Sequence, residues 1–268
     1  MSKMEPRDGY LTSGGYKLHY LLWGGTGPKI VILHSMGMDA HGFDVFSEAL
    51  QGEYQILAFD ILDHGDSEKP EEPVTLKDLA EIMRDGYRQL GFIPNVLIGH
   101  SVGGMIGMVL VADYPDDLKG LVLVDIAPFD RSERSRRPPP PEFFHSEAEA
   151  REYIEQRYTG FTPEAVENRM KHAFVRDEEG RLKLKGTGAT IGPGLTTDLW
   201  PYVERMETPT LLILGSESDL VTKETLERME RTLPDLGVIT IKDATHMVPQ
   251  DKPKEFEQHV RGFLNKLL

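Results

Sequence analysis

The chain of 268 residues contains no cysteine. Without thiols it can form no disulfide, no thiolate zinc site and no iron–sulfur cluster, and a cysteine nucleophile is excluded. The absence of cysteine favours a reducing compartment, so we expect a cytoplasmic protein. We also expect neither a metal ion nor any other cofactor.

Basic residues are scarce as well, since 30 lysines and arginines face 44 acidic residues and give a formal charge of −14. Such a charge is repelled by nucleic acids and by anionic lipid surfaces. The longest apolar stretch, residues 96–112, is too short to span a bilayer, and residues 1–10 lack the apolar core of a signal peptide. We therefore expect a small-molecule partner, with no nucleic acid and no membrane. The sequence does not indicate an oligomeric state.

Short apolar runs alternate with helical patterns through the first half of the chain. Residues 16–23 alternate in polarity like an antiparallel strand. A helix is predicted from Thr75, whose hydroxyl can cap it together with Asp78. Nearly continuous apolar runs are typical of parallel strands buried on both faces, and they occupy residues 29–33, 55–59, 96–98 and 121–124. The alternation predicts an α/β fold with a doubly wound, mostly parallel sheet.

This rhythm stops at Phe129 and resumes near residue 209. Between them the chain reads as loop, a proline run and helices without apolar strands. We therefore predict an α/β core made of residues 1–128 and 200–268. Residues 129–199 are predicted to form a helical cap inserted between the two parts.

Residues 99–103 form a G-x-S-x-G sequence that follows one apolar run and opens a helical stretch. A sharp strand-to-helix turn needs small residues on both sides of the serine, because its backbone is strained and its neighbours are crowded. Such a turn holds the Ser101 hydroxyl at the C-terminal edge of the sheet, where a nucleophile is useful. The alternative is a tight turn in which Ser101 merely caps the helix.

A serine nucleophile needs a base and a third group that holds the base. His246 lies in the loop after the last predicted strand, so it reaches the same edge as Ser101. Asp219 follows the preceding strand and completes the chain order serine, acid, histidine. Glu217, in the same loop, and Asp125, at the end of residues 121–124, are the alternatives for the acid.

Acyl transfer also needs two N–H donors for the developing oxyanion. The amide of Val102 follows the nucleophile directly, and the amide of Met36 lies in the loop after residues 29–33. We interpret the side chains of His34 and Ser35 in that loop as structural. The acidic and histidine residues of segment 60–66 lack the spacing of metal ligands, and we interpret this segment as a tight loop.

These residues together resemble the α/β-hydrolase superfamily over nearly the whole chain. The resemblance rests on LLWGGTGPKIVILHSMG, DILDHGDS, GHSVGG and DIAP, and on the Asp219 and His246 loops. His34–Ser35 stands where the family usually has His-Gly, and Asp63 stands where it usually has Gly. The resemblance implies about eight strands and a carboxylesterase or enol-lactonase with a short helical cap.

The expected activity is hydrolysis of carboxylic esters of small to medium apolar substrates through an acyl-enzyme. A lactonase for acyl-homoserine or enol lactones, and a carbon–carbon hydrolase, would use the same triad. A non-catalytic receptor of the same fold is the third alternative. We expect an apolar substrate pocket beneath the cap, lined by Ser35, Met38, Phe129, Phe144, Tyr158, Trp200 and Met247.

Overall fold

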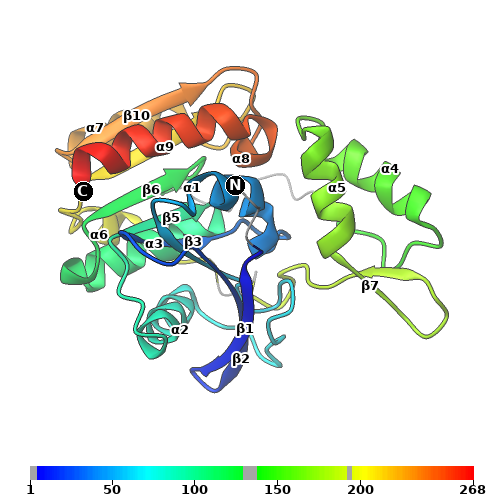
Figure 1. The fold of residues 1–268 in the computed structure, drawn as a ribbon. Coiled ribbons are helices and arrows are strands. Elements are labelled where there is room, and N and C mark those ends of the chain that lie inside the picture. Colours follow the sequence, from blue (N-terminus) through cyan, green and yellow to red (C-terminus); the bar gives the residue numbers. More distant parts are fainter. Residues whose placement is uncertain (1–4, 129–137, 192–194) are drawn as a thin grey trace.

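A computed structural model describes residues 5–128, 138–191 and 195–268, and its centre is one eight-stranded sheet (Figure 1). The strand order is β1-β2-β4-β3-β5-β6-β9-β10. β1 and β2 are antiparallel, and all strands from β4 to β10 along this order run parallel. The strands are β1 (Arg7–Ser13), β2 (Tyr16–Trp23), β3 (Lys29–Leu33), β4 (Gln55–Phe59), β5 (Val96–His100), β6 (Gly120–Val124), β9 (Thr210–Gly215) and β10 (Leu236–Ile241). The predicted fold class is confirmed.

Helices cover both faces of this sheet. On β3, Val31 and Leu33 pack toward one face, while Ile30 and Ile32 pack toward the other. The first face is covered by α2 (Leu76–Gln89), α3 (Val102–Asp113), α6 (Trp200–Val203) and α7 (Lys223–Thr232). The second is covered by α1 (Asp44–Leu50) and α9 (Pro253–Leu267). Burial on both faces explains why the parallel strands are almost continuously apolar.

The predicted start of α2 is confirmed in detail. The Thr75 hydroxyl accepts from the Asp78 amide, and the Asp78 carboxylate accepts in return from the Thr75 amide. This capping box satisfies two of the N–H groups that the first turn of a helix leaves unpaired. The shorter helical elements are η1 (Ala40–Phe43), η2 (Pro115–Asp117) and α8 (Val248–Asp251).

A separate group of elements lies to one side of the sheet, on the right in Figure 1. It contains α4 (Glu147–Arg157), α5 (Pro163–His172), β7 (Phe174–Arg176) and β8 (Leu182–Leu184). Its small core brings together Phe144, Ala150, Ile154, Val166, Ala173, Phe174 and Leu182. We call these elements the cap.

The sequence predicted no strand in this region, and that prediction is wrong, because β7 and β8 pair as an antiparallel hairpin. The strands have only three residues each, too few to give a clear alternation of polarity.

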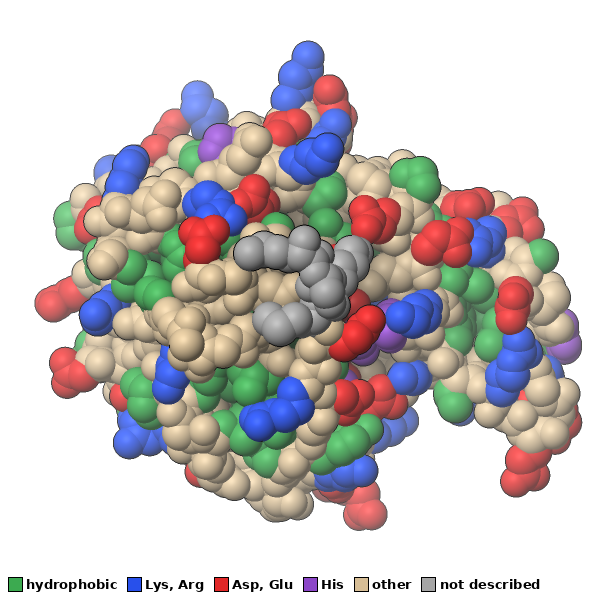
Figure 2. Space-filling model, in the orientation of Figure 1, with side chains coloured by type: hydrophobic (Ala, Val, Ile, Leu, Met, Phe, Trp, Pro, Cys, Tyr) green, Lys and Arg blue, Asp and Glu red, His purple; other side chains and the backbone are tan. Residues whose placement is uncertain are grey.

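Acidic and basic side chains are interspersed over the face of the molecule drawn in Figure 2. Within the described ranges, none of the helices combines the length and the apolar character needed to cross a bilayer.

Candidate active site

Ser101 occupies a strained turn between β5 and α3. Its backbone has φ 52° and ψ −113°, values that side-chain-bearing residues rarely adopt, and its side chain does not cap α3. The surrounding glycines are needed for space. A Cβ on Gly99 would lie 2.4 Å from the Gly103 carbonyl oxygen, and one on Gly103 would lie 2.2 Å from the Leu33 carbonyl oxygen. The strain therefore serves to hold the Ser101 side chain at the edge of the sheet rather than to cap the helix.

His246 lies in the loop between β10 and α8, and its partner is Asp125. His246 Nδ1 is 2.7 Å from Asp125 Oδ2, and Asp125 directly follows β6. The Asp125 carboxylate is buried, and it also accepts from the Gly215 amide at 3.1 Å and from the Ser218 hydroxyl at 2.5 Å. Because a buried carboxylate needs such donors, these contacts fix its orientation. The Nδ1 contact leaves Nε2 as the ring nitrogen that can exchange a proton.

The structure pairs His246 with Asp125, whereas the sequence-based choice of acid was Asp219. Asp219 and Glu217 are both exposed, and the Glu217 carboxylate accepts from the Ser216 hydroxyl. Asp125 was one of the two alternatives for the acid in the sequence analysis. It occupies the position next to His246 Nδ1 that the third group of a triad needs. The reason is topological: β6 pairs with both β5 and β9, so the end of β6 lies directly beside the serine-bearing strand. Asp125 has φ 47°, so its side chain leaves the strand end at an unusual angle.

His100 attaches the His246 loop to the serine turn. The Nε2–H of His100 donates to the His246 carbonyl oxygen at 2.8 Å, and the two rings lie 4.9 Å apart between centroids. His100 precedes Ser101 directly, so this contact brings the backbone of His246 to the residue beside the serine. Burial lowers the pKa of His100 well below the ordinary value, which keeps its ring neutral. The sequence analysis gave His100 no role, although its place next to Ser101 was visible.

The loop that follows β3 is held by two buried histidines. His34 Nε2 accepts from the Ile61 amide at 2.9 Å, and His64 Nε2 accepts from the Gly37 amide at 2.9 Å. Each ring donates through Nδ1 to a backbone carbonyl, that of Ser35 for His34 and that of Leu62 for His64. Burial lowers the pKa of His34, and it lowers that of His64 to about 3, so both rings are neutral acceptors. The loop carrying Met36 is thereby fixed to the loop after β4.

The two amides predicted to bind an oxyanion lie on adjoining segments. Val102 is the first residue of α3, and Met36 lies in the loop after β3. The Gly103 amide donates to the His34 carbonyl at 3.2 Å, which joins the start of α3 to that loop. Their role as oxyanion donors stays a prediction.

Segment 60–66 is built around one buried carboxylate. Asp60 Oδ2 accepts from His19 Nδ1 at 2.7 Å and from the Asp66 amide at 2.8 Å, while Oδ1 accepts from the Ala40 amide at 2.7 Å. Burial opposes the charge of Asp60, but the hydrogen bonds from His19 and from the Ala40 amide hold its pKa at about 2. Donors from the protein itself thus occupy both oxygens of Asp60, as expected for a carboxylate that holds a tight loop together.

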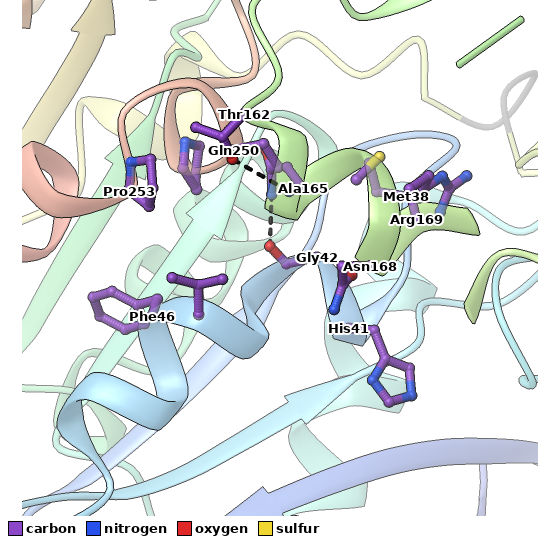
Figure 3. A pocket seen from close by; sticks show the side chains of 12 residues that line it. Met38, His41, Gly42, Phe46, Thr162, Ala165, Asn168, Arg169, Gln250 and Pro253 are labelled. Atoms are coloured by element: carbon purple, nitrogen blue, oxygen red, sulfur yellow. Dashed lines mark hydrogen bonds between the residues drawn. The ribbon is translucent and has the colours of Figure 1, made fainter. Parts of the chain in front are cut away.

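A cap residue that the sequence did not indicate reaches the Met36 loop. Arg169 of α5 is only 4% exposed; it donates through Nη1 to Asp39 Oδ2 at 2.5 Å and through Nη2 to the Gly37 carbonyl. Figure 3 shows Arg169 beside Met38 at the joint between α5 and the core. Farther along the chain, the Gly188 amide donates to the Asp63 carbonyl at 3.1 Å. α5 of the cap thus contacts the loop after β3, and the segment that follows the cap contacts the loop after β4.

The predicted pocket residues do not gather at one place. Phe129 lies outside the described residues. Phe144 belongs to the cap core, and Tyr158 stacks on Phe161 beside it. Trp200 packs under the Arg228 guanidinium on the α6 side of the core. The role of these three aromatic residues as substrate-lining residues stays a prediction, because aromatic spacing along a helix does not distinguish packing within the cap from a lining role.

The remaining predicted pocket residues come from the core loops. Ser35 and Met247 are buried, the latter next to His246. Met38 lines a cavity between η1, α5 and α8, where Gln250 Nε2 donates to the Gly42 carbonyl (Figure 3). That the side chains of Ser35 and Met247 face a substrate stays a prediction.

Known proteins resemble this chain over most of its length. It is 25% identical over 248 residues to 2-(acetamidomethylene)succinate hydrolase of Mesorhizobium japonicum, covering 90% of this chain and 89% of that protein. It is 28% identical to the sn-1-specific diacylglycerol lipase of Mus musculus, covering 89% and 81%. An esterase of Mycobacterium tuberculosis is also 28% identical, covering 91% and 85%.

Solved structures agree with the fold. The crystal structure of E-2-(acetamidomethylene)succinate hydrolase matches with a TM-score of 0.87 at 24% identity, covering 97% of this chain and 99% of that one. A family model described as the alpha/beta hydrolase family matches residues 30–259. The chain therefore belongs to the alpha/beta hydrolase family.

Proposed function

We propose that this hydrolase cleaves carboxylic esters of small to medium apolar substrates through an acyl-enzyme on Ser101. His246 Nε2 accepts the proton of the Ser101 hydroxyl as its oxygen attacks the ester carbonyl. The Met36 and Val102 amides bind the oxyanion, and His246 then gives the proton to the departing alkoxide. A water molecule repeats the sequence on the acyl-enzyme, which releases the acid and restores Ser101.

One observation carries this proposal: His246 Nδ1 lies 2.7 Å from a buried Asp125 carboxylate. This contact fixes the tautomer that carries the proton on Nδ1, and it stabilises the imidazolium that forms when Nε2 takes a second proton. His100, which bonds the His246 backbone, directly precedes Ser101 in the chain. A base that is already oriented in this way is what a weak serine nucleophile requires.

The named relatives support the reaction class more than the substrate. Two are an esterase and a diacylglycerol lipase, whose names indicate ester cleavage. A third is named for hydrolysis of 2-(acetamidomethylene)succinate, which is a different kind of substrate. Lactones and carbon–carbon substrates therefore belong in the same test as simple esters.

The proposal is tested with a fluorophosphonate probe and p-nitrophenyl esters. The parent protein is expected to be labelled and to turn over the esters. Ser101→Ala should lose both properties while keeping its melting temperature, because only a hydroxyl is removed. The loss in kcat should be at least about 10⁴-fold. Turnover that persists in the folded variant would exclude Ser101 as the nucleophile.

A panel of esters, acyl-homoserine lactones, enol lactones and ring-cleavage products then separates the alternatives. Highest kcat/KM for an acyclic ester supports the proposal. If a lactone or a carbon–carbon substrate has the highest kcat/KM, the proposed substrate class is wrong, while the proposed triad is retained. A labelled protein with no turnover of any panel member would overturn the assignment as an ester hydrolase.

A further inference from the structure

Two histidines and an aspartate meet where the cap joins the core, and none of them belongs to the Ser101 site. His41 lies in η1, Asp44 begins α1, and His172 ends α5. One ligand atom from each of the three lies within 4.8 Å of the other two. His41 Nδ1 is 2.9 Å from Asp44 Oδ2, and His172 Nε2 is 4.0 Å from the same oxygen.

The side chains are placed so that an ion from solvent could reach them. Their exposed fractions are 16% for His41, 17% for Asp44 and 19% for His172, so the group lies just beneath the surface. The imidazole rings stack with centroids 3.5 Å apart and planes 16° apart. His41 Nδ1 already faces Asp44 Oδ2, so a movement of the His172 ring toward the same oxygen would place both nitrogens and the oxygen around one ion.

The Asp44 carboxylate is held in place through one oxygen, while its other oxygen lacks a hydrogen-bond donor. Asn168 Nδ2 donates to its Oδ2 at 2.9 Å, which fixes the plane of the group. Its other oxygen, Oδ1, is buried and has no hydrogen-bond partner among the residues that the structure describes. A buried carboxylate oxygen without a donor is unfavourable. A cation bound at Oδ2 would compensate the charge of this carboxylate, and a cation held by both oxygens would also satisfy Oδ1.

We propose that His41, Asp44 and His172 bind a divalent transition metal ion such as Zn²⁺, Co²⁺ or Ni²⁺, with water in the remaining positions. Two imidazoles and one carboxylate are a ligand set that these ions favour. The three ligand atoms already lie within 4.8 Å of one another, so bonds of about 2.0–2.2 Å need only local movement of these side chains. The ion takes the place of the proton between His41 and Asp44. The bonds formed would link α5 of the cap to η1 and α1 of the core.

This site has a direct structural consequence for α5. Arg169, one turn before His172, donates to the Gly37 carbonyl in the loop that carries Met36. An ion held by His172 and Asp44 would keep that turn of α5 against the core. The metal site is independent of the proposed ester hydrolysis, because binding can be measured without turnover.

The test uses the full-length protein after treatment with EDTA. We expect calorimetry to give one Zn²⁺ or Ni²⁺ per chain, and Co²⁺ to give visible absorption bands. The melting temperature should rise by about 5 °C or more at an ion concentration 100 times Kd. Mg²⁺ should leave it unchanged, because that ion prefers six oxygen ligands.

Variants decide whether these residues are the ligands. His172→Gln and Asp44→Asn should each weaken Zn²⁺ binding at least about 100-fold, and Asn168→Ala should weaken it about 10-fold. His145→Gln is the matched control, since His145 is an exposed cap histidine outside the group, and it should bind like the parent. Unchanged affinity in either folded ligand variant would overturn the site. If His172→Gln does not fold, Asp44→Asn gives the decision.

Discussion

At the scale of single residues, burial and donors distinguish the acid of the candidate triad from its competitors. Asp125 is 1% exposed and accepts hydrogen bonds from His246, Ser218 and Gly215, whereas Asp219 is exposed. A carboxylate in water gains little from an imidazole, because the surrounding solvent screens the interaction. A buried one holds the ring firmly and stabilises its charged form.

Replacing the two acids should therefore have very different effects on ester hydrolysis. Asp125→Asn is expected to lower kcat by about 10⁴-fold, since a neutral amide holds the wrong His246 tautomer. Asp219→Asn should leave kcat within about 2-fold, because Asp219 is exposed and the His246 ring already bonds Asp125. Both values come from steady-state kinetics on a p-nitrophenyl ester.

The comparison needs a check on folding, because Asp125 also accepts from the Gly215 amide. Melting curves of Asp125→Asn identify any loss of the native state at the assay temperature. A large loss of kcat in Asp219→Asn, with Asp125→Asn unaffected, would return the acid to the loop after β9.

At the scale of elements, α5 controls how the cap meets the core. Its buried Arg169 pairs with Asp39, and both side chains are less than 8% exposed. The same guanidinium donates to the Gly37 carbonyl, beside Met36. Arginine suits this position because its planar fork can serve two acceptors at once, which a lysine ammonium does less well.

Arg169→Met should destabilise the protein by about 3–5 kcal/mol, because Asp39 is left buried and unpaired. It should also lower kcat, because the loop carrying Met36 loses a contact that orients it. Urea denaturation gives the first quantity and ester kinetics the second. Lys171→Met, an exposed cation-to-methionine change on the same helix, is the control and should alter neither.

A double variant separates charge compensation from positioning. Arg169→Met with Asp39→Leu removes the unpaired charge, so most of the stability should return. The activity should stay low if the guanidinium orients the loop. Full recovery of activity would mean that Arg169 only neutralises Asp39.

At the scale of the whole molecule, neutral buried histidines link stability to pH. Burial lowers the pKa values of His34, His64 and His100, and that of His64 falls to about 3. Below pH 6.5 these histidines bind protons in the unfolded chain, whereas in the folded protein they stay neutral. Acid therefore favours unfolding. Burial also disfavours the charge of His19, but the hydrogen bond to Asp60 and the negative charges of Asp60, Asp8 and Asp66 together raise its pKa, which acts in the opposite direction.

The free energy of unfolding should therefore decrease as the pH falls from 6.5 toward 3, the window set by His64. Each such histidine contributes up to about 1.4 kcal/mol per pH unit. Urea denaturation at pH 7.5, 6.5 and 5.5 measures the slope. His64→Gln should make it shallower, while the exposed His145→Gln should not change it. Stability that rises on acidification would contradict this account.

Features fixed by neighbours in the chain could be predicted. The apolar strand runs, the Thr75 cap and the glycines around Ser101 depend on residues a few positions apart, so their patterns are visible in the sequence. The edge that collects Ser101 and His246 also follows from parallel strands, whose C-terminal ends meet. The three-residue strands β7 and β8 were missed because they are too short to show a period.

The sequence by itself determined the α/β fold, the strained serine turn and the histidine loop, since each is encoded by local composition and spacing. Only the tertiary structure decided that Asp125 contacts His246 and that Arg169 donates a hydrogen bond to the Gly37 carbonyl in the Met36 loop. It alone brought His172 to His41. These contacts join segments far apart in the chain. For His246 several carboxylates were available in the sequence, and burial and strand order selected Asp125 among them.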